Sequence, residues 1–309
     1  MTDDNKPTCG QRMSACGRFL YNKDRGTFLG RTPKSWALIT IFYLIYYSCL
    51  AAFFVGMLSV LLFGIIDDTK PMLTGEQSLI RMNPGLGMRP MPDVERTLIN
   101  VNASDQKNLD RLVGNLDQLV NSYSSVNKSL EDPNMEYANC NLEDAEANRD
   151  FDPKKKICRI DPSKHWGNCT SANKFGYESA TPCVIIKMNK IYGWLPDIED
   201  PQLSNHTLMR CEPENDGDKA TFGSGSLLYY PGVTVNGTDY GYFSSALFPY
   251  LNQKGYTTPA VAVRFPNARR NVLLMVSCRL YNIKNYRYDK MDRDGMVRFE
   301  LLIINTGSR

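Results

Sequence analysis

Residues 36–66 of this chain read WALITIFYLIYYSCLAAFFVGMLSVLLFGII, without a single Asp, Glu, Lys, Arg or His. A bilayer core about 30 Å thick is crossed by about 20 helical residues. A buried helix of a soluble protein rarely continues this long without a charge, and such a run is typical of a membrane span. The stretch therefore predicts one transmembrane helix over residues 36–66, long enough to cross with tilt.

The segments that flank this helix predict its direction across the membrane. Residues 1–35 contain seven basic and three acidic side chains. Basic flanks stay on the cytosolic side, so we expect a cytosolic N-terminal tail and an extracellular segment from residue 67 onward. A cleaved signal peptide has a shorter apolar region and a small-residue cleavage site. The helix is therefore interpreted as an uncleaved signal-anchor, and the chain as a single-pass type II membrane protein.

The predicted helix also carries residues suited to contact with another membrane helix. Tyr43 and Tyr47 are one turn apart, and small residues recur every four positions at Ser48, Ala52 and Gly56. Small residues let two helices approach closely, and tyrosine hydroxyls can hydrogen-bond across the pair. The alternative is an aromatic belt at the membrane interface, which suits a residue at the start of the helix better than it suits Tyr47.

Residues 67–309 contain most of the chain but little net charge. The whole chain has a formal charge of +3, and the basic tail accounts for it. A near-neutral segment lacks the basic field that nucleic acids require. The only two histidines, His165 and His206, have no recognisable Ser or Cys nucleophile motif around them. We expect no catalytic site, and we expect neither a metal nor another cofactor.

The nine cysteines divide among the predicted compartments. Cys9 and Cys16 belong to the tail and Cys49 to the helix. The other six are extracellular: Cys140, Cys158, Cys169, Cys183, Cys211 and Cys278. An even number in an oxidising compartment indicates three disulfides, although many pairings are possible. The sequential pairing (140–158, 169–183, 211–278) is the simplest, and each loop would stabilise the fold by roughly 3–4 kcal/mol. Zinc is the rival use, but the extracellular spacings contain no Cys-x-x-Cys.

Asn-x-Ser/Thr sequons occur only in the predicted extracellular part of the chain. They are Asn102, Asn127, Asn168, Asn205 and Asn236. Each predicts a bulky sugar on a surface loop. Their distribution agrees with the predicted topology, but it does not identify a function.

The extracellular part divides into a stalk and a folded domain. Pro and Gly are frequent in residues 67–95, so residues 67–103 are predicted to form an extended stalk. Apolar residues at helical spacing predict one amphipathic helix over about residues 104–123. Short apolar runs bounded by Gly, Pro and Asn predict strands. These runs cover residues 184–188, 227–230, 260–265, 272–281 and 297–304. The alternation in the last run is typical of an antiparallel sheet with one wet face, so residues 104–309 are predicted to form a β-sandwich.

Two functional alternatives follow from this organisation. A type II topology with a stem and a glycosylated domain is compatible with a Golgi glycosyltransferase, and three Asp-x-Asp triplets occur, at 150–152, 216–218 and 292–294. Three occurrences in one chain show that this pattern has little specificity, and the alternation of strands and helices typical of a nucleotide-sugar fold is missing. The other alternative is a cell-adhesion glycoprotein of the plasma membrane.

Several longer strings point to a known family. They read FLGRTPKSW (28–36), FYLIYYSCLA (42–51), PGL (84–86), PCVIIKMNKIYGW (182–194) and FPY (248–250). In this order they resemble the beta subunits of the Na⁺/K⁺-ATPase and its H⁺/K⁺-ATPase relatives. The chain departs from the family pattern in two places. Vertebrate members read Tyr-Tyr-Pro-Tyr-Tyr-Gly where this chain has Tyr229-Tyr230-Pro231-Gly232, and Ser48 replaces a common helix glycine.

The resemblance implies an accessory beta subunit of a P2-type cation pump, most closely the Na⁺/K⁺ pump, without a catalytic site of its own. Such a subunit pairs with a ten-helix catalytic alpha subunit at the plasma membrane, assists its folding and delivery, and tunes K⁺ occlusion. A small single-span regulatory subunit is a further partner that the family allows, and membrane lipid surrounds the helix. The resemblance also implies the sequential disulfide pairing.

The resemblance further assigns contact residues. Tyr43 and Tyr47 match positions that touch a transmembrane helix of the alpha subunit. The extracellular domain is similar to an immunoglobulin-like antiparallel β-sandwich that covers an extracellular loop of the alpha subunit. Tyr242, Phe243 and Tyr250 form an aromatic run that is a candidate part of this surface. Packing in the core is the alternative role for these three residues.

Overall fold

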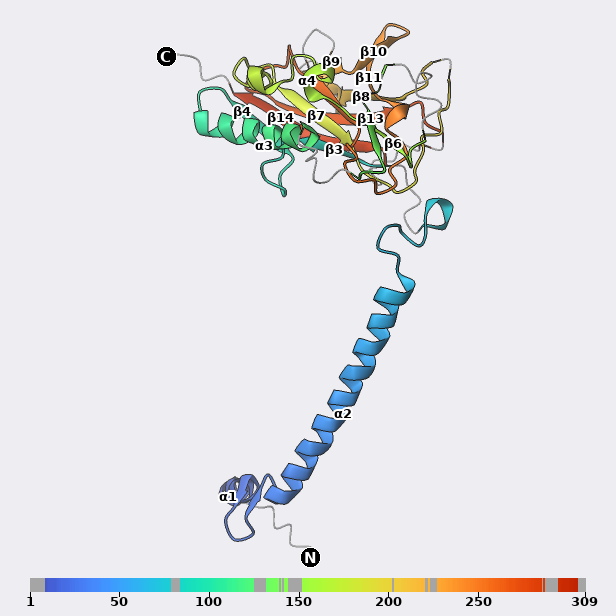
Figure 1. The fold of residues 1–309 in the computed structure, drawn as a ribbon. Helices are drawn as coiled ribbons and strands as arrows, with labels where there is room; N and C mark the ends of the chain where they lie inside the picture. The colour runs from blue at the N-terminus through green and yellow to red at the C-terminus, as the bar shows by residue number, and fades with distance from the viewer. Residues whose placement is uncertain are drawn as a thin grey trace, which may run out of the picture. The chain divides into compact units, whose positions relative to one another are not determined.

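The structure is a computed structural model that describes residues 9–78, 84–124, 132–138, 140, 142–143, 152–201, 203–219, 222, 227–284, 286 and 294–304. The chain divides into two compact units, Met1–Asp68 and Thr69–Arg309, shown in Figure 1. Each unit is described by itself.

The first unit is built around one long helix. Helix α2 (Pro33–Ser59) continues into a π-helical turn, η1 (Val60–Ile65). The most apolar 18-residue stretch of the combined Pro33–Ile65 segment has a mean hydropathy of 2.3, and this segment is the one described helix long and apolar enough to cross a membrane. The helix begins three residues before the predicted Trp36 because Thr32 caps it, accepting a hydrogen bond from the Ser35 backbone N–H at 3.4 Å. Proline is favoured in the first helical turn after such a cap.

A short helix and a hairpin precede α2. Helix α1 (Cys9–Leu20) leads into strands β1 (Tyr21–Asn22) and β2 (Thr27–Phe28). The backbone N–H of Leu29 donates to the carbonyl of Leu20 at 3.0 Å. The indole N–H of Trp36 donates to the carbonyl of Phe28 at 2.9 Å. The tail is therefore folded against the start of α2, and Trp36 has a specific partner there.

The second unit contains two main sheets. The larger sheet has the order β10-β11-β8-β13-β14-β4, and the smaller has the order β3-β7-β12-β9. The larger comprises β10 (Gly232–Val235), β11 (Thr238–Phe243), β8 (Thr207–Pro213), β13 (Leu273–Tyr281), β14 (Met296–Ile304) and β4 (Leu98–Asn102). The smaller comprises β3 (Leu86–Arg89), β7 (Cys183–Met188), β12 (Ala260–Arg264) and β9 (Leu228–Tyr230). Strands β5 (Glu136–Ala138) and β6 (Lys156–Cys158) form a separate pair.

The described residues of the second unit also form helices. They are η2 (Gly75–Gln77), α3 (Gln106–Ser124), α4 (Pro162–His165), η5 (Ser171–Gly176), α5 (Asp216–Lys219) and η6 (Ser245–Leu247). Helix α3 is the amphipathic helix that the sequence predicts. It buries Leu109, Leu112 and Leu116 and lies along one side of the sheets in Figure 1.

One hydrophobic core joins the two sheets. Residues of both sheets and of α3 form a single buried cluster. Strand β14 shows the predicted alternation, because Phe299, Leu301 and Ile303 are fully buried while Glu300 accepts a hydrogen bond from the Thr97 hydroxyl at 2.7 Å. Strand β7 is buried along almost its whole length. The domain is therefore mainly β and stabilised chiefly by burial of apolar surface.

Two features of the predicted organisation require correction. The predicted stalk, residues 67–103, contains two strands, because β3 pairs with β7 and β4 pairs with β14. The β4–β14 pair and the β5–β6 pair are parallel, so the sheets are not purely antiparallel. Both strands in the stalk are short, and their pairing partners lie far along the chain. Tertiary pairing therefore overrides a Pro- and Gly-rich local sequence.

Candidate partner-binding surfaces

Aromatic side chains form two adjacent rows on α2. The rings of Tyr43 and Tyr47 stack with centroids 5.9 Å apart, and those of Phe42 and Tyr46 stack at 6.3 Å. Edge-on contacts at 5.4 Å (Phe42–Tyr43) and 5.3 Å (Tyr46–Tyr47) join the rows. Tyr43 is 49 % exposed and Tyr47 59 % exposed. The four rings therefore contact one another and form a single exposed surface on the helix that is predicted to cross the membrane.

The small residues of α2 lie on another side of the helix. At 3.6 residues per turn, the mean direction of the row of Ser48, Ala52 and Gly56 is turned by about 160° from that of Tyr43 and Tyr47. All five residues are exposed. A Cβ added at Gly56 would meet nothing within 4 Å. One partner helix packed on the tyrosine row cannot also cover the small-residue row along its length, so the predicted contact set divides into two surfaces.

Tyr250 belongs to a cluster of aromatic side chains in the second unit. Its ring lies 6.5 Å from that of Tyr192 and 5.0 Å from that of Tyr256. The Lys190 ammonium lies 5.1 Å from the Tyr250 ring centroid and 5.5 Å from that of Tyr256. Desolvation lowers the pKa of Lys190, and cation–π contact helps to hold such an ammonium beside the rings. We call these four residues the Tyr250 cluster.

Polar contacts join the Tyr250 cluster to the beginning of the second unit. The Tyr250 hydroxyl donates to the side-chain oxygen of Asn252 at 3.0 Å, and the Asn252 amide donates to the carbonyl of Thr69 at 3.1 Å. The backbone N–H of Gly193 also donates to the Tyr250 carbonyl, at 2.8 Å. The cluster is therefore fixed against the residues that follow the predicted membrane segment in the chain.

Tyr242 and Phe243 do not share this surface. They are 5 % and 1 % exposed, respectively. Tyr242 stacks on the His206 ring, with centroids 4.8 Å apart and planes at 15°. Phe243 belongs to the hydrophobic core. Successive side chains of β11 point to opposite faces of the sheet, so Tyr242 and Phe243 have different neighbours. Tyr250 lies beyond the turn that follows β11 and belongs to the Tyr250 cluster. The three residues therefore do not form one surface. Core packing, the alternative weighed for these residues, describes Phe243, whereas Tyr242 is buried against His206 at the wall of a cleft.

The three disulfides have the sequential pairing. Bonds join Cys140 to Cys158, Cys169 to Cys183, and Cys211 to Cys278. The last bond joins neighbouring strands, because Cys278 of β13 is directly opposite Cys211 of β8 in the register. Both of its cysteines are buried in the core.

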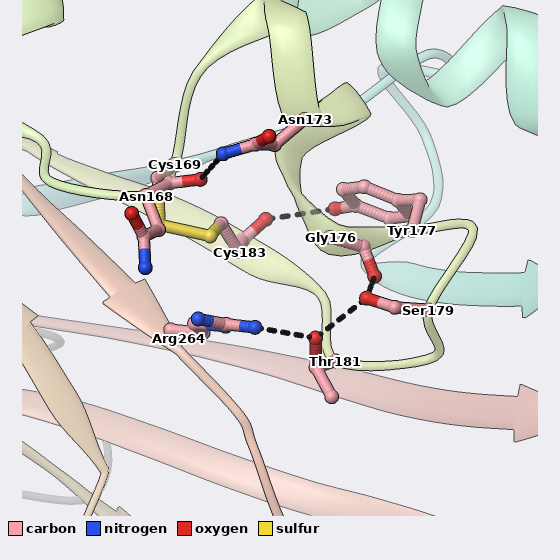
Figure 2. The surroundings of a disulfide bond; sticks show 9 residues. All are labelled: Asn168, Cys169, Asn173, Gly176, Tyr177, Ser179, Thr181, Cys183 and Arg264. Carbon is pink, nitrogen blue, oxygen red and sulfur yellow. Dashed lines mark hydrogen bonds between the residues drawn. A yellow bond between two sulfur atoms is a disulfide. The ribbon is translucent and has the colours of Figure 1, made fainter.

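The loop closed by Cys169–Cys183 is fixed by several hydrogen bonds, as Figure 2 shows. The buried Tyr177 hydroxyl donates to the Cys183 carbonyl at 2.9 Å. The Ser179 hydroxyl donates to the Gly176 carbonyl at 3.1 Å. Burial raises the pKa of the Tyr177 hydroxyl well above its usual range, so it remains a donor. The disulfide and the Tyr177 hydrogen bond therefore both attach this loop to Cys183, the first residue of β7.

Four of the five sequons lie within the described residues. Asn168, Asn205 and Asn236 are exposed, and Asn102 is half-buried. Asn127 lies outside the described residues. An exposed side chain on a loop or turn is the position that a sugar requires.

A cleft of about 620 Å³ lies beside β9 and β10 and holds both histidines of the chain. The Ser245 N–H donates to Nδ1 of His206 at 3.3 Å, and Nε2 lies 3.2 Å from the Glu143 carbonyl oxygen. His165 lies with its Nδ1 2.8 Å from the carbonyl of Asp161. These contacts occupy ring nitrogens with backbone groups, which is the pattern of structural histidines. Within the described part of the chain, no group of three His, Cys, Asp or Glu residues could hold a metal ion.

Sequence reasoning missed the partners of Tyr250. Tyr192 and Lys190 fall in the string 182–194, which carries part of the family resemblance, but no pattern assigns them a role. The signal that could have indicated this cluster is a pair of aromatic residues two positions apart in each segment. These pairs are Tyr192 with Trp194 and Phe248 with Tyr250. The Trp194 and Phe248 rings also meet, edge-on at 5.3 Å.

The chain is similar to known proteins along most of its length. The sequence pattern of the family described as "Sodium / potassium ATPase beta chain" matches residues 6–299. Sodium/potassium-transporting ATPase subunit beta-2 of Drosophila melanogaster is 30 % identical over 329 residues, with 97 % of this chain and 95 % of that protein covered. Probable sodium/potassium-transporting ATPase subunit beta-3 of Caenorhabditis briggsae is 33 % identical, with 93 % and 86 % covered. The Homo sapiens subunit beta-2 is 31 % identical, with 97 % and 98 % covered.

Proposed function

The chain belongs to the sodium/potassium ATPase beta chain family, an accessory subunit of the pump, and we propose that it assists the folding and plasma-membrane delivery of the catalytic alpha subunit and adjusts its K⁺ affinity. The observation that carries this proposal is the exposed double row of aromatic rings on α2. Four ordered rings on a single span supply a lateral surface for another membrane helix. Transport chemistry is assigned to the alpha subunit.

The proposed topology places the tail in the cytosol and the second unit outside the cell. The basic tail supports this direction, and the three disulfides support an oxidising compartment for the second unit. The exposed sequons are compatible with glycosylation there. We also assign the two-sheet domain to the immunoglobulin-like class, on the basis of its two packed sheets. The Cys211–Cys278 bond differs from the immunoglobulin pattern, because it joins neighbouring strands of one sheet.

The double variant Tyr43→Ala/Tyr47→Ala tests the proposed helix contact. Removing both rings is expected to weaken association with the alpha subunit by about 1–3 kcal/mol, because each side-chain contact between membrane helices contributes of the order of 1 kcal/mol. The measurement is co-precipitation of the alpha subunit from cells that express both chains, together with the K⁺ concentration for half-maximal pump activity.

A comparison variant, Phe42→Ala/Tyr46→Ala, removes the same number of rings from the neighbouring row and shows which of the two rows contributes more to the contact. A second arm, Gly56→Ile, fills the small-residue row on another side of the helix. If the alpha subunit is captured equally by the Tyr43/Tyr47 variant and the wild type, with K⁺ dependence unchanged, the helix contact is wrong. If only Gly56→Ile reduces capture, the contact belongs to the small-residue row.

We place the extracellular contact at the Tyr250 cluster. The variant Tyr250→Ala is expected to shift the apparent K⁺ affinity by about fivefold, a coupling at the lower end of the usual range for linked sites. The physical reason is that Tyr250 joins Tyr192, Tyr256 and Lys190 into one surface. Pump current measured against external K⁺ reports the shift.

Tyr240→Ala is the control for this prediction. Tyr240 is also half-buried and also pairs edge-on with another tyrosine, Tyr281, at 5.7 Å. It lies on β11, outside the Tyr250 cluster. An equal shift for Tyr240→Ala and Tyr250→Ala would show a general loss of stability and remove the reason for assigning the contact to the cluster.

A further inference from the structure

Strand β10 forms one edge of the larger sheet. In the strand order it is terminal, and among the described residues it pairs with β11 alone. The β10–β11 hairpin projects from the body of the domain in Figure 1. The pairing is regular, from Gly232 opposite Gly241 to Val235 opposite Thr238. An edge strand presents unpaired backbone N–H and C=O groups to any other extended chain.

Apart from its short length and the proline that precedes it, β10 lacks the usual devices that protect such an edge. Its residues, Gly232–Val235, read Gly-Val-Thr-Val and carry no charge, and the register contains no bulge. The opposite edge of the same sheet, strand β4, is in contact with a helix. There, the backbone N–H of Asn102 on β4 donates at 3.2 Å to the side chain of Asn108 on α3, so a helix lies against that edge. Natural sheets protect edges with charges, prolines, bulges or covering elements.

A sequon occupies the turn beside the unprotected edge. Asn236 and Gly237 connect β10 to β11 with φ of 50° and 75°, which is the left-handed pair that a two-residue hairpin turn requires. Asn236 is exposed and Thr238 completes the sequon. We propose that an N-linked glycan on Asn236 shields the β10 edge from antiparallel pairing with β10 of a second copy of this chain. The inference rests on the proposed extracellular location of the domain.

A second copy is the occupant that the edge fits best. Two β10 strands related by a two-fold axis are self-complementary. Because β10 is uncharged, no like charges meet across that axis, and the alternation of Val and Thr suits strand pairing. A hollow of about 210 Å³ beside the edge is lined by residues that include Leu228, Val233 and Tyr240. It offers a place for the side chains of an added strand.

The test uses the full-length chain in two differently tagged forms, co-expressed with the alpha subunit and extracted in mild detergent. Asn236→Asp removes the sequon and keeps a residue that tolerates the left-handed conformation. We expect recovery of one tagged copy with the other to rise at least about fivefold, because several cross-strand pairs form together. Thr238→Ser retains the sequon and should match the wild type.

Two further variants separate edge pairing from a general effect of losing a sugar. Asn102→Asp removes a sequon beside α3 and keeps the side-chain oxygen that accepts from the Ser104 N–H, so copy-to-copy recovery should not rise. Adding Thr234→Lys to Asn236→Asp places a charge on the exposed edge, across from Asp239. This change should return recovery to the wild-type level.

Three results would overturn the proposal. They are an unchanged electrophoretic mobility of Asn236→Asp, which would show that the site carries no sugar, an unchanged copy-to-copy recovery, and a failure of Thr234→Lys to reverse the rise. Capture of the alpha subunit is scored on the same samples. Its absence from every sample, including the wild type, would contradict the proposed function, while copy-to-copy recovery would still decide the role of Asn236.

Discussion

Gly176→Ala is expected to destabilise the extracellular domain by about 4 kcal/mol, because the residue combines a left-handed conformation with a backbone contact that leaves no room for a methyl group. Gly176 has φ of 76°, and an added Cβ would lie 2.2 Å from the Thr181 carbonyl oxygen. The Thr181 N–H donates to the Gly176 carbonyl at 3.0 Å, and the Ser179 hydroxyl donates to the same oxygen. Figure 2 shows Gly176 and Ser179 beside the Cys169–Cys183 bond.

Urea-dependent proteolysis of the purified full-length chain measures this change, and the fraction delivered to the cell surface reports it in cells. Gly193→Ala is the matched control, because Gly193 has a similar φ of 71° but nothing within 4 Å of an added Cβ. We expect Gly193→Ala to lower the free energy of unfolding by only about 1–2 kcal/mol, which is the cost of placing alanine in the left-handed conformation. Equal losses for the two variants would mean that the contact between Gly176 and Thr181 has no role in stability.

Removal of the Cys211–Cys278 bond is expected to have the second large effect. The double variant Cys211→Ala/Cys278→Ala removes a bond between two residues that are 67 positions apart in the sequence. In the chain-entropy model such a loop is worth about 4 kcal/mol, against about 3 kcal/mol for loops as short as the other two. Both sulfurs are also buried between β8 and β13, where small cavities would remain. We expect the variant to be retained in the endoplasmic reticulum.

The measurement is the fraction of chain that acquires mature glycans and reaches the surface. Cys140→Ala/Cys158→Ala is the control, because its bond joins residues only 18 apart and flanks the small β5–β6 pair rather than the central strands. Normal surface delivery of the Cys211/Cys278 variant, together with retention of the control, would contradict the prediction that the Cys211–Cys278 bond stabilises the domain more than the Cys140–Cys158 bond does.

Long uniform patterns made the main elements predictable from the sequence. The charge-free run predicted the helix that the structure has as α2, and alternation predicted β14, since Phe299, Leu301 and Ile303 share one buried face. The ends of elements depended on local capping. Thr32 starts α2 before the apolar run begins. Helix α1 was not predicted, because its few apolar residues form no long periodic pattern.

Pairing between distant segments explains most of what the sequence could not show. Strands β3 and β4 lie in a Pro- and Gly-rich stretch, and only their partners β7 and β14 determine that they are strands. The aromatic run around β11 looked continuous, yet Tyr242 is buried against His206 while Tyr250 joins another cluster. Composition predicted aromatic residues for a contact surface, and tertiary structure determines which of these aromatic residues are exposed.

The account depends most on the association of α2 with a larger membrane protein. Purification of this chain from its native membrane in mild detergent, followed by identification of what accompanies it, tests that association directly. We predict a P-type ATPase alpha subunit in equal amount with the chain. Recovery of the chain alone, under conditions that keep known pump complexes together, would contradict the account.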